Sequence, residues 1–273
     1  MQNHTSKSGE LLGTPNATGE GNQQPSPNKG KVQRLLWSLL KAEPERFKML
    51  KTKRTVSILT GMVLGDGHLR KPSVNDKSVS LIMRHCARQK EYLAHKTELL
   101  NKIFGKKINI HEINNNGYPG VSASFGHPYF RSLRKFMYPG GGKFISKKVL
   151  NRLTPEGIAI WYMDDGSLAL HKKNGYIHSR EIYLNTYTSM VEAAYCRDFF
   201  KENFDIDFRI SPSKGKHRLI CNSKNSIKFV NIVKPYIIPT MEYKIDLKYK
   251  YPANIAKAQS TSARHALAGS VMI

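Results

Sequence analysis

Two short apolar segments, each ending in an acid and a glycine, decide the fold of this chain: LTGMVLGDG at residues 59–67 and IAIWYMDDG at residues 158–166. The second segment is introduced by Thr154 and Pro155. Threonine is a good N-cap and proline suits the first helical position, so this pair predicts the start of a helix. Both segments are therefore interpreted as short apolar helices that end at an Asp-Gly pair.

The acids that end the two segments, Asp66 and Asp165, stand 99 residues apart. Either Asp-Gly pair alone predicts no more than a helix end or a turn. We expect Gly67 and Gly166 to take the left-handed conformation that ends many helices. If the two helices pair about a twofold axis, both carboxylates reach one spot. Like charges held that close are costly unless cations neutralise them, and a hard divalent ion is the natural partner.

A second repeat of nearly the same spacing supports the pairing of the two segments. Residues 91–110 align with residues 191–210, and both predict a helix that leads into a strand. The apolar positions that coincide are Leu93 and Ala193, Leu99 and Phe199, Leu100 and Phe200, Phe104 and Phe204, Ile108 and Phe208, and Ile110 and Ile210. Asp66 and Asp165 are separated by nearly the same number of residues as the two aligned segments. The chain is therefore interpreted as an internal duplication.

The same order of elements is predicted in each copy: helix, two strands, helix, two strands, helix. Alternating apolar and polar residues predict a half-buried strand before each aligned helix, and a second strand pair and a helical stretch follow it. The segments are strands 78–86 and 180–188, turns 114–117 and 212–215, and helical stretches 127–139 and 223–239. Duplication of a unit of this size predicts an α+β fold of two αββαββα repeats related by a pseudo-twofold axis.

Composition predicts how the rest of the chain is organised. Residues 1–30 are rich in Gly, Ser, Asn, Gln and Pro without a hydrophobic period, which predicts disorder. Residues 31–54 contain eight basic and two acidic residues with leucines at helical spacing. They predict a basic amphipathic helix that packs on the core or contacts phosphates. The two repeats are expected at 55–152 and 153–251, followed by a poorly ordered tail at 252–273.

The charge of the chain predicts a polyanionic partner. Its 273 residues contain 44 Lys and Arg against 20 Asp and Glu, a formal net charge of +24. Neutralised phosphates release counterions and strengthen binding, so nucleic acid is the expected partner. No apolar run approaches the ~18–20 residues of a spanning helix, and the N-terminus lacks the apolar core of a secretory signal. Three widely spaced cysteines predict neither a zinc site nor disulfides, and indicate a reducing, intracellular compartment.

The stretch LTPEGIAIWYMDDGS at residues 153–167 makes the resemblance to a known family specific. Together with residues 59–67 and the duplicated order of elements, it resembles the LAGLIDADG homing endonucleases, in particular the branch whose second motif reads close to LTPEGLAxWYMDDGS. The resemblance spans residues 55–250. It implies that the two motif helices form the interface between the halves, and that two antiparallel sheets form a saddle in the DNA major groove.

The resemblance also implies the chemistry. Asp66 and Asp165 would hold Mg²⁺ or Mn²⁺, and Gly65 and Asp164 would each offer a backbone carbonyl to the metal. The implied activity is that of a monomeric, site-specific endonuclease that cuts both strands of a long double-stranded site by metal-assisted hydrolysis. An intron-encoded mobile element in a mitochondrion or chloroplast is the expectation at the level of the family.

A basic residue is expected to position the attacking water or to stabilise charge at the phosphate. Lys143 and Lys244 occupy loosely corresponding places in the two copies and are the candidates. The second motif helix carries bulky residues where small ones often permit close packing, so Gly61 and Gly65 on the first are expected to supply the room. The Asp164 side chain could tune the metal site or face outward, and the outward orientation is the one expected.

Base reading is expected from side chains that alternate along the strands. Arginine pairs bidentately with guanine, and lysines near hairpin tips suit phosphate contacts. The predicted base-reading residues are Arg70, Arg84, Arg180, Arg209 and Arg218, and the predicted phosphate contacts are Lys71, Lys214 and Lys216.

Other functions fit parts of this pattern. The string YMDD at residues 162–165 also occurs in reverse transcriptases, but there it lies in a hairpin turn and here it closes a predicted helix. An RNA maturase with intron RNA as partner, or a non-cleaving DNA-binding relative, would use the same fold. Acids in both motifs favour cleavage, because a pure binder has no need to hold two carboxylates against phosphates. An intein is disfavoured, because no splicing block with a terminal His-Asn precedes the chain end.

Overall fold

The computed structural model describes residues 50–247 apart from residues 116 and 175. All of them belong to one compact unit, Glu45–Ile273. Within this described part, no helix is long and apolar enough to cross a membrane. The segments predicted at residues 1–30 and 252–273, and most of the basic extension predicted at residues 31–54, lie outside the described residues.

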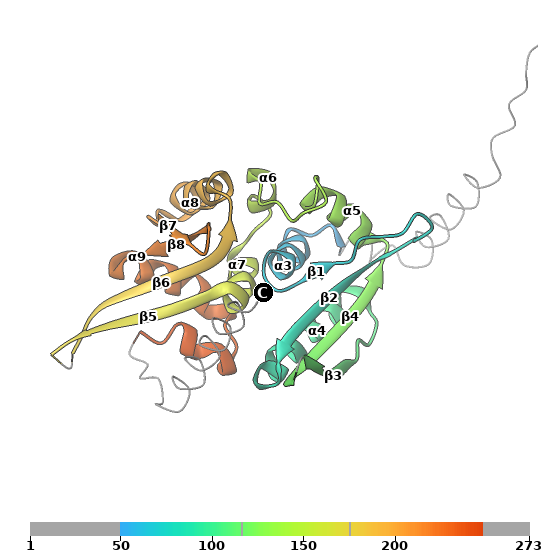
Figure 1. Ribbon diagram of the computed structural model, residues 1–273, viewed down its shortest axis with the longest axis horizontal. Helices are drawn as coiled ribbons and strands as arrows, with labels where there is room; N and C mark the ends of the chain where they lie inside the picture. The colour runs from blue at the N-terminus through green and yellow to red at the C-terminus, as the bar shows by residue number, and fades with distance from the viewer. Residues whose placement is uncertain (1–49, 116, 175, 248–273) are drawn as a thin grey trace, which may run out of the picture. The chain divides into compact units, whose positions relative to one another are not determined.

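The first half of the described chain has the predicted order of elements and is drawn from blue to green in Figure 1. The elements are α3 (Lys53–Leu64), β1 (His68–Leu69), β2 (Val79–Cys86), the 3₁₀ turn η1 (Ala87–Gln89), α4 (Lys90–Phe104), β3 (Ile110–Asn115), β4 (Tyr118–His127), α5 (Tyr129–Met137) and α6 (Lys147–Leu150). The strands form one antiparallel sheet in the order β1-β2-β4-β3, and α4 and α5 contact it. Helix α4 ends at Gly105, whose φ of 62° suits a glycine.

The second half repeats this order and runs from yellow to red in Figure 1. The elements are α7 (Pro155–Asp165), β5 (Gly166–Lys173), β6 (Tyr176–Thr188), α8 (Met190–Phe204), β7 (Arg209–Ser213), β8 (Lys216–Cys221), α9 (Ser223–Val233), and the 3₁₀ segments η2 (Lys234–Tyr236) and η3 (Pro239–Lys244). The sheet order β5-β6-β8-β7 matches that of the first half, and α8 and α9 contact this sheet. The predicted duplication is therefore confirmed.

Each sheet buries one face against helices and leaves the other face open. Side chains alternate between the two faces along β2 and β6, following the two-residue period of a strand. The buried apolar side chains of these strands are Val79, Leu81, Met83, Ile182 and Leu184. Burying each contributes about 1.5–3 kcal/mol, and a one-residue slip would expose the whole set. The core therefore fixes which side chains the open faces present.

The two motif helices, α3 and α7, pack directly against each other at the centre of the described chain (Figure 1). A Cβ atom added at Gly61 would lie 2.2 Å from the carbonyl oxygen of Gly157, and one added at Gly157 would lie 2.2 Å from Oγ of Ser57. The expected role of Gly61 is confirmed, and Gly157 is its partner on the second helix. Gly65 makes room for a side chain instead, because its added Cβ would lie 2.2 Å from Oδ2 of Asp164.

The predicted start of α7 is confirmed, with Thr154 as N-cap and proline in the first turn. The Thr154 side chain does not cap its own helix. Its hydroxyl and its backbone N–H both donate to Oγ of Ser57 on α3, at 2.9 and 2.7 Å. Arg54 of α3 also forms two hydrogen bonds of 2.7 Å with the carboxylate of Glu156 on α7. The beginnings of the two helices are therefore tied together.

The glycines that follow the motif acids are required for a different reason from the predicted one. Gly166 has an extended backbone, with φ −83° and ψ 153°, and Gly67 is not among the residues with positive φ. The predicted left-handed conformation is therefore wrong. A Cβ at Gly67 would lie 2.3 Å from the carbonyl oxygen of Met62, and one at Gly166 would lie 2.0 Å from the Tyr162 ring. Each glycine lets the chain leave its helix in close contact with the last turn.

Candidate active site

Asp66 and Asp165 lie at the ends of the two packed motif helices, as predicted. Asp165 is the last residue of α7, and Asp66 follows Gly65, which is the C-cap of α3. Burial raises the pKa of Asp165 to about 7, and the negative charges of Asp164 and Asp66 add to this shift. Burial and then the charge of Asp164 also raise the pKa of Asp66. The fold therefore gathers three acidic side chains into one site.

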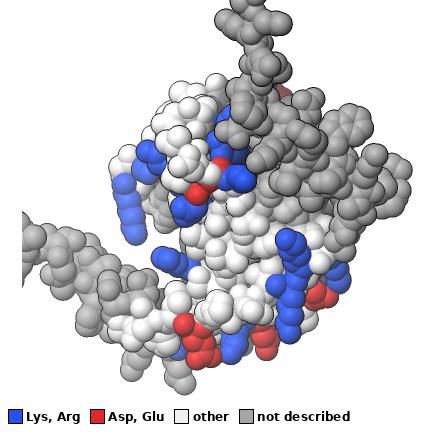
Figure 2. All heavy atoms as spheres, turned by 90° about the vertical axis from the view of Figure 1, so that its right-hand side faces the viewer, with Lys and Arg blue, Asp and Glu red and all other residues white. Residues whose placement is uncertain are grey.

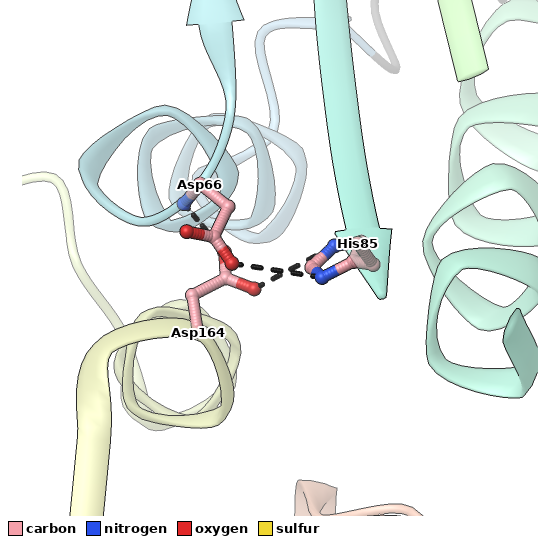
Figure 3. Close-up of side chains that lie close together, drawn as sticks. All are labelled: Asp66, His85 and Asp164. Carbon is pink, nitrogen blue, oxygen red and sulfur yellow. Dashed lines mark hydrogen bonds and ion pairs between the residues drawn. The ribbon is translucent and has the colours of Figure 1, made fainter. Parts of the chain in front are cut away.

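The side chain of Asp164 points into the molecule, so the outward orientation expected for it is wrong. It is fully buried, and its Oδ2 accepts a hydrogen bond of 3.0 Å from the backbone N–H of Asp66. Figure 3 shows Asp164 reaching from α7 toward the end of α3, with His85 of β2 beside both acids. The space that this carboxylate fills exists because Gly65 has no side chain.

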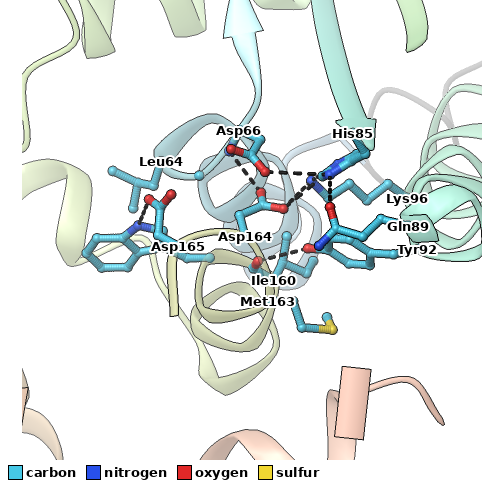
Figure 4. Close-up of polar contacts among 12 residues, drawn as sticks. Leu64, Asp66, His85, Gln89, Tyr92, Lys96, Ile160, Met163, Asp164 and Asp165 are labelled. Atoms are coloured by element: carbon cyan, nitrogen blue, oxygen red, sulfur yellow. Dashed lines mark hydrogen bonds and ion pairs between the residues drawn. The ribbon is translucent and has the colours of Figure 1, made fainter. Parts of the chain in front are cut away.

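A buried lysine neutralises Asp164. Lys96 comes from the buried face of α4, and its Nζ lies 2.5 Å from Oδ1 of Asp164 and 3.1 Å from Nε2 of His85. Burial, followed by the charge of Lys96, lowers the pKa of His85 to about 4. Its ring is therefore neutral at neutral pH, so Nε2 accepts from the ammonium group and the Nδ1 hydrogen donates to Oε1 of Gln89 at 3.2 Å. Figure 4 shows this network beside the two motif helices.

Asp66, His85 and Asp164 form a group that could hold a metal ion, because one ligand atom of each lies within 4.8 Å of the others. The Lys96 ammonium group already contacts two of the three. A second cation between the same two side chains would be repelled by that ammonium. The donor set therefore favours Asp66, whose side chain is 43% exposed, as the member of this group that is open to a cation.

Lys143 and Lys244 both lie at the site, in equivalent places. Nζ of Lys143 donates to the carbonyl oxygens of the two residues before Asp66, and Nζ of Lys244 donates to those of the two residues before Asp165. The distances are 3.2 Å to Leu64 and 2.9 Å to Gly65 for Lys143, and 2.5 Å to Met163 and 3.3 Å to Asp164 for Lys244. The two lysines therefore occupy equivalent positions in the duplicated fold, although Lys143 lies in a loop and Lys244 ends the 3₁₀ segment η3.

Burial lowers the pKa of both lysines. For Lys244 it falls to about 8, because burial outweighs the opposing effect of the three aspartates, and the same two influences act on Lys143. The Tyr162 hydroxyl donates to the backbone carbonyl of Lys244 at 2.7 Å, which fixes this residue against α7. A lysine with a pKa near 8 can carry a positive charge or exchange a proton close to neutral pH.

Neutral donors hold Asp165, in contrast to the charged network beside Asp66. Nε1 of Trp161, one turn earlier on α7, donates to Oδ2 of Asp165 at 3.1 Å. The side-chain amide of Asn185 on β6 donates to the backbone carbonyl of Asp165 at 3.0 Å and to Oγ of Ser167 at 3.3 Å. The two halves of the site therefore have equivalent acids and lysines but different supporting contacts.

A profile of the LAGLIDADG DNA endonuclease family matches residues 56–229, which include most of α3, all of α7, both acids and Lys143. This chain belongs to the LAGLIDADG family. A protein named RecA from Mycolicibacterium chitae is 30% identical over 228 residues, which are 80% of this chain and 51% of that protein. A probable intron-encoded endonuclease of Wickerhamomyces canadensis is 25% identical over 204 residues, 68% of this chain and 81% of the relative.

Structural comparison supports the same fold. The homing endonuclease I-WcaI bound to its DNA recognition sequence matches with a TM-score of 0.63 and 24% identity, over 72% of this chain and 88% of that chain. The family resemblance of the sequence and the predicted fold are thus confirmed. This LAGLIDADG chain spans about half the length of the RecA proteins that it matches.

The open faces of the two LAGLIDADG sheets carry several of the arginines predicted to read bases. Arg84 lies on the open face of β2, between buried neighbours. The guanidinium of Arg218 on β8 lies over the Tyr183 ring, 4.7 Å from its centroid. Arg209 on β7 binds Glu181 at 3.3 Å, and this carboxylate also accepts from the Tyr183 hydroxyl at 2.7 Å. The second sheet therefore presents two arginines that its own side chains hold in place.

Arg180 is an exception to the predicted set. On β6 it lies in phase with the buried residues Ile182 and Leu184, not with the open-face residue Tyr183. Its Nε donates to the backbone carbonyl of Leu247 at 2.9 Å. The predicted reach of Arg180 toward bases is therefore wrong, because strand alternation turns its side chain toward the helical layer.

The remaining predicted contacts lie at the ends of strands. Arg70 directly follows β1 and binds Asp76 at 2.7 Å, and Lys71 is exposed in the loop that follows it. Lys214 lies in the tight turn between β7 and β8 and Lys216 begins β8, so their predicted position at a hairpin tip is confirmed. Figure 2 shows one side of the molecule, on which basic side chains lie at several separate places with acidic ones beside some of them.

Sequence reasoning missed the buried network of the first half. Lys96 lies on the same face of α4 as Tyr92 and Leu100, and a charge at a position of the apolar stripe was the available signal. In the alignment of the two repeats, Lys96 corresponds to Cys196, which is buried and uncharged. Such a mismatch between copies of a duplicated LAGLIDADG fold marks a contact that only one half makes. His85 has no comparable signal, since a histidine at a strand end is common.

Proposed function

We propose that this protein is a site-specific double-strand DNA endonuclease in which Asp66 and Asp165 act together at one site. The observation that carries the proposal is the equivalence of the two acids at the ends of α3 and α7, where their negative charges repel each other. A protein that only binds DNA gains nothing from carboxylates that repel the phosphates. Membership of the LAGLIDADG DNA endonuclease family supports the same reaction class.

The donor set at this site fits Mg²⁺ or Mn²⁺. Hard divalent ions prefer carboxylate and carbonyl oxygens, and the site offers the carboxylates of Asp66 and Asp165. The carbonyls of Gly65 and Asp164 beside them accept from Lys143 and Lys244, so each would reach an ion through its second lone pair. Burial raises the pKa of Asp165, the negative charges of Asp164 and Asp66 add to this shift, and a bound cation would oppose it. When bound, such an ion lowers the pKa of a coordinated water and stabilises negative charge on phosphate oxygens.

Lys143 and Lys244 would each serve one strand. Their ammonium groups are held on the carbonyls beside the two acids, where the backbone of a cut strand would pass. A positive charge fixed in advance stabilises the charge that develops on a phosphate, and a pKa near 8 for Lys244 suits proton exchange with an attacking water or a leaving oxygen. These roles account for lysines that the fold buries at a cost.

The open faces of the two sheets would contact the DNA. Arg84, Arg209 and Arg218 project from these faces and would read base edges, while Lys214 and Lys216 at a hairpin tip would contact phosphates. The solved homing endonuclease I-WcaI was bound to its DNA recognition sequence, and its likeness supports this mode of binding. Because one chain supplies both acids, both lysines and both sheets, we propose that a monomer is active.

A cleavage selection tests this function. A plasmid library with a randomised duplex insert is incubated with the wild-type protein, with and without Mg²⁺, alongside Asp66→Asn and Asp165→Asn. The proposal predicts metal-dependent double-strand cuts at one family of sequences by the wild type, and binding without cutting by both variants. Undiminished cutting by both variants contradicts it. Preferred binding to a structured intron RNA with no DNA cut would select the maturase function instead.

A further inference from the structure

The Asp66 half and the Asp165 half of the site are supported by unlike contacts, although their acids and lysines are equivalent. Beside Asp165, the donors are the indole of Trp161 and the amide of Asn185, both of which are neutral. Beside Asp66, the supporting contact is the hydrogen bond that the Asp66 backbone N–H donates to the carboxylate of Asp164. The Asp66 half of the site therefore depends on a buried carboxylate that reaches from α7 to the end of α3.

That buried charge depends on Lys96. The side chains of Lys96 and Asp164 are both fully buried and lie 2.5 Å apart. His85 accepts a hydrogen bond from the same ammonium at 3.1 Å, and Nζ also lies over the Tyr92 ring, 4.6 Å from its centroid. Without Lys96 the Asp164 carboxylate would be a buried anion without a cation beside it, and would have to turn away or take up a proton.

We propose that Lys96 is a positioning residue for the Asp66 half of the site, acting through Asp164 on the backbone of Asp66. The chain of contacts has two steps: Lys96 Nζ to Oδ1 of Asp164, and Oδ2 of Asp164 to the backbone N–H of Asp66. Loss of either contact removes the restraint on the backbone of Asp66. Only the first half has this chain of contacts, because the aligned position in the second half is Cys196, which carries no charge, so the Asp66 half should depend on Lys96 more strongly than the Asp165 half.

This inference rests on the proposed endonuclease function and predicts that the two DNA strands depend on Lys96 unequally. Lys96→Met keeps an unbranched side chain that is one atom shorter and removes its charge. On a duplex recovered from the library selection, with each strand labelled at one end, we expect one strand to be cut roughly 10–100-fold more slowly while the other changes little. DNA binding should stay within about threefold of the wild type. A supercoiled plasmid with this site should accumulate nicked circles.

Three further variants separate positioning from loss of folding. Asp164→Leu should slow the same strand, because it removes the oxygen that accepts from the Asp66 backbone N–H. The double variant Lys96→Met with Asp164→Leu leaves no buried charge unpaired, so it should regain thermal stability and still cut that strand slowly. Cys196→Ala, at the aligned position of α8, is the matched control. It should lower stability without changing the ratio of the two strand rates.

The outcomes show whether Lys96 positions Asp66 or only stabilises the fold. A strand-rate ratio that stays at the wild-type value in Lys96→Met, Asp164→Leu and the double variant overturns the proposal, whatever the total rate. Return of the slow strand to the wild-type rate in the double variant also overturns it, because the defect would then come from instability alone.

A measurement on the protein without DNA keeps the proposal testable if the wild type cuts no DNA, a result that would count against the proposed function alone. In ¹⁵N-labelled protein, the amide of Asp66 donates to Asp164 and should show a shifted resonance and faster hydrogen exchange in Lys96→Met. The amide of Asp165 should change much less. An Asp66 amide that exchanges as slowly in Lys96→Met as in the wild type overturns the positioning role.

Discussion

Nζ of Lys96 lies 2.5 Å from the carboxylate of Asp164, and both side chains are fully buried. A buried pair of this kind adds little net stability over an apolar pair of the same shape, but removing one partner leaves an uncompensated charge. Because Asp164 also accepts from the Asp66 backbone and fills the space above Gly65, the pair lies at the junction of the two halves. Its consequences for stability can be measured apart from any activity.

We expect Lys96→Met to lower the free energy of unfolding by about 3–5 kcal/mol, because it strands the Asp164 carboxylate in the interior. Asp164→Asn should cost a similar amount. The double variant should recover most of the loss, so that a double-mutant cycle in urea gives a large coupling energy. Additive losses from the two single changes would show that the two side chains do not depend on each other.

Gly61→Ala should destabilise the protein by about 3 kcal/mol, because its Cβ would lie 2.2 Å from a backbone oxygen of the facing motif helix. Backbone atoms cannot move aside as a flexible side chain can. Gly140→Ala is the matched control, since nothing lies within 4 Å of the added Cβ, and it should change stability by less than about 0.5 kcal/mol. Equal midpoints of urea unfolding for the two variants would contradict the close helix packing.

In metal-free protein, Asp165 should make stability fall as the pH rises. Its pKa in the folded protein, about 7, lies above the ordinary value of 3.8, so the folded state holds the proton more tightly than the unfolded state. This contribution is complete below pH 4 and is lost as the pH rises through 7, with a total of roughly 2–4 kcal/mol. Asp165→Asn should flatten the profile of unfolding free energy between pH 4 and 8. Glu202→Gln, at an exposed position, should not.

Arg209→Ala and Arg180→Ala should affect DNA binding differently, although both arginines belong to the second half. Arg209 projects from the open face, and loss of a bidentate base contact costs about 1–3 kcal/mol, so affinity should fall by about 5- to 150-fold. Arg180 faces the helical layer and donates to Leu247, so its loss should leave affinity nearly unchanged. Fluorescence anisotropy on the selected duplex without divalent metal measures both. A larger loss of affinity for Arg180→Ala than for Arg209→Ala would contradict DNA binding by the open face of the second sheet.

The sequence was sufficient to predict the duplicated order of elements and the convergence of Asp66 and Asp165, because both follow from periodicity and phase. Lys143 and Lys244 were also placed in equivalent positions by their spacing. The orientation of Asp164 was not predictable, since it depends on space above Gly65 and on a charge from α4. Arg180 was misplaced because a strand has two faces, and the buried set that decides between them became clear only from the packing of β6.

The role of Gly67 and Gly166 shows a different limit. Both residues were correctly placed at the ends of the motif helices, but a glycine there is compatible with a left-handed turn or with close contact, and sequence does not separate the two. The structure places backbone or ring atoms within 2.3 Å of an added Cβ at each. The requirement for glycine is therefore set by packing of the last helical turn.

The most direct test of the shared site is single-turnover cleavage of the selected duplex by Asp66→Asn and Asp165→Asn, measured with the binding affinity of the same proteins in the same buffer with Mg²⁺. Each variant removes one negative charge and keeps the shape of the side chain. We predict that each variant binds the duplex within about tenfold of the wild type and loses at least about a thousandfold in cleavage rate. Cleavage of both strands at the wild-type rate by either variant would contradict a site that the two acids share.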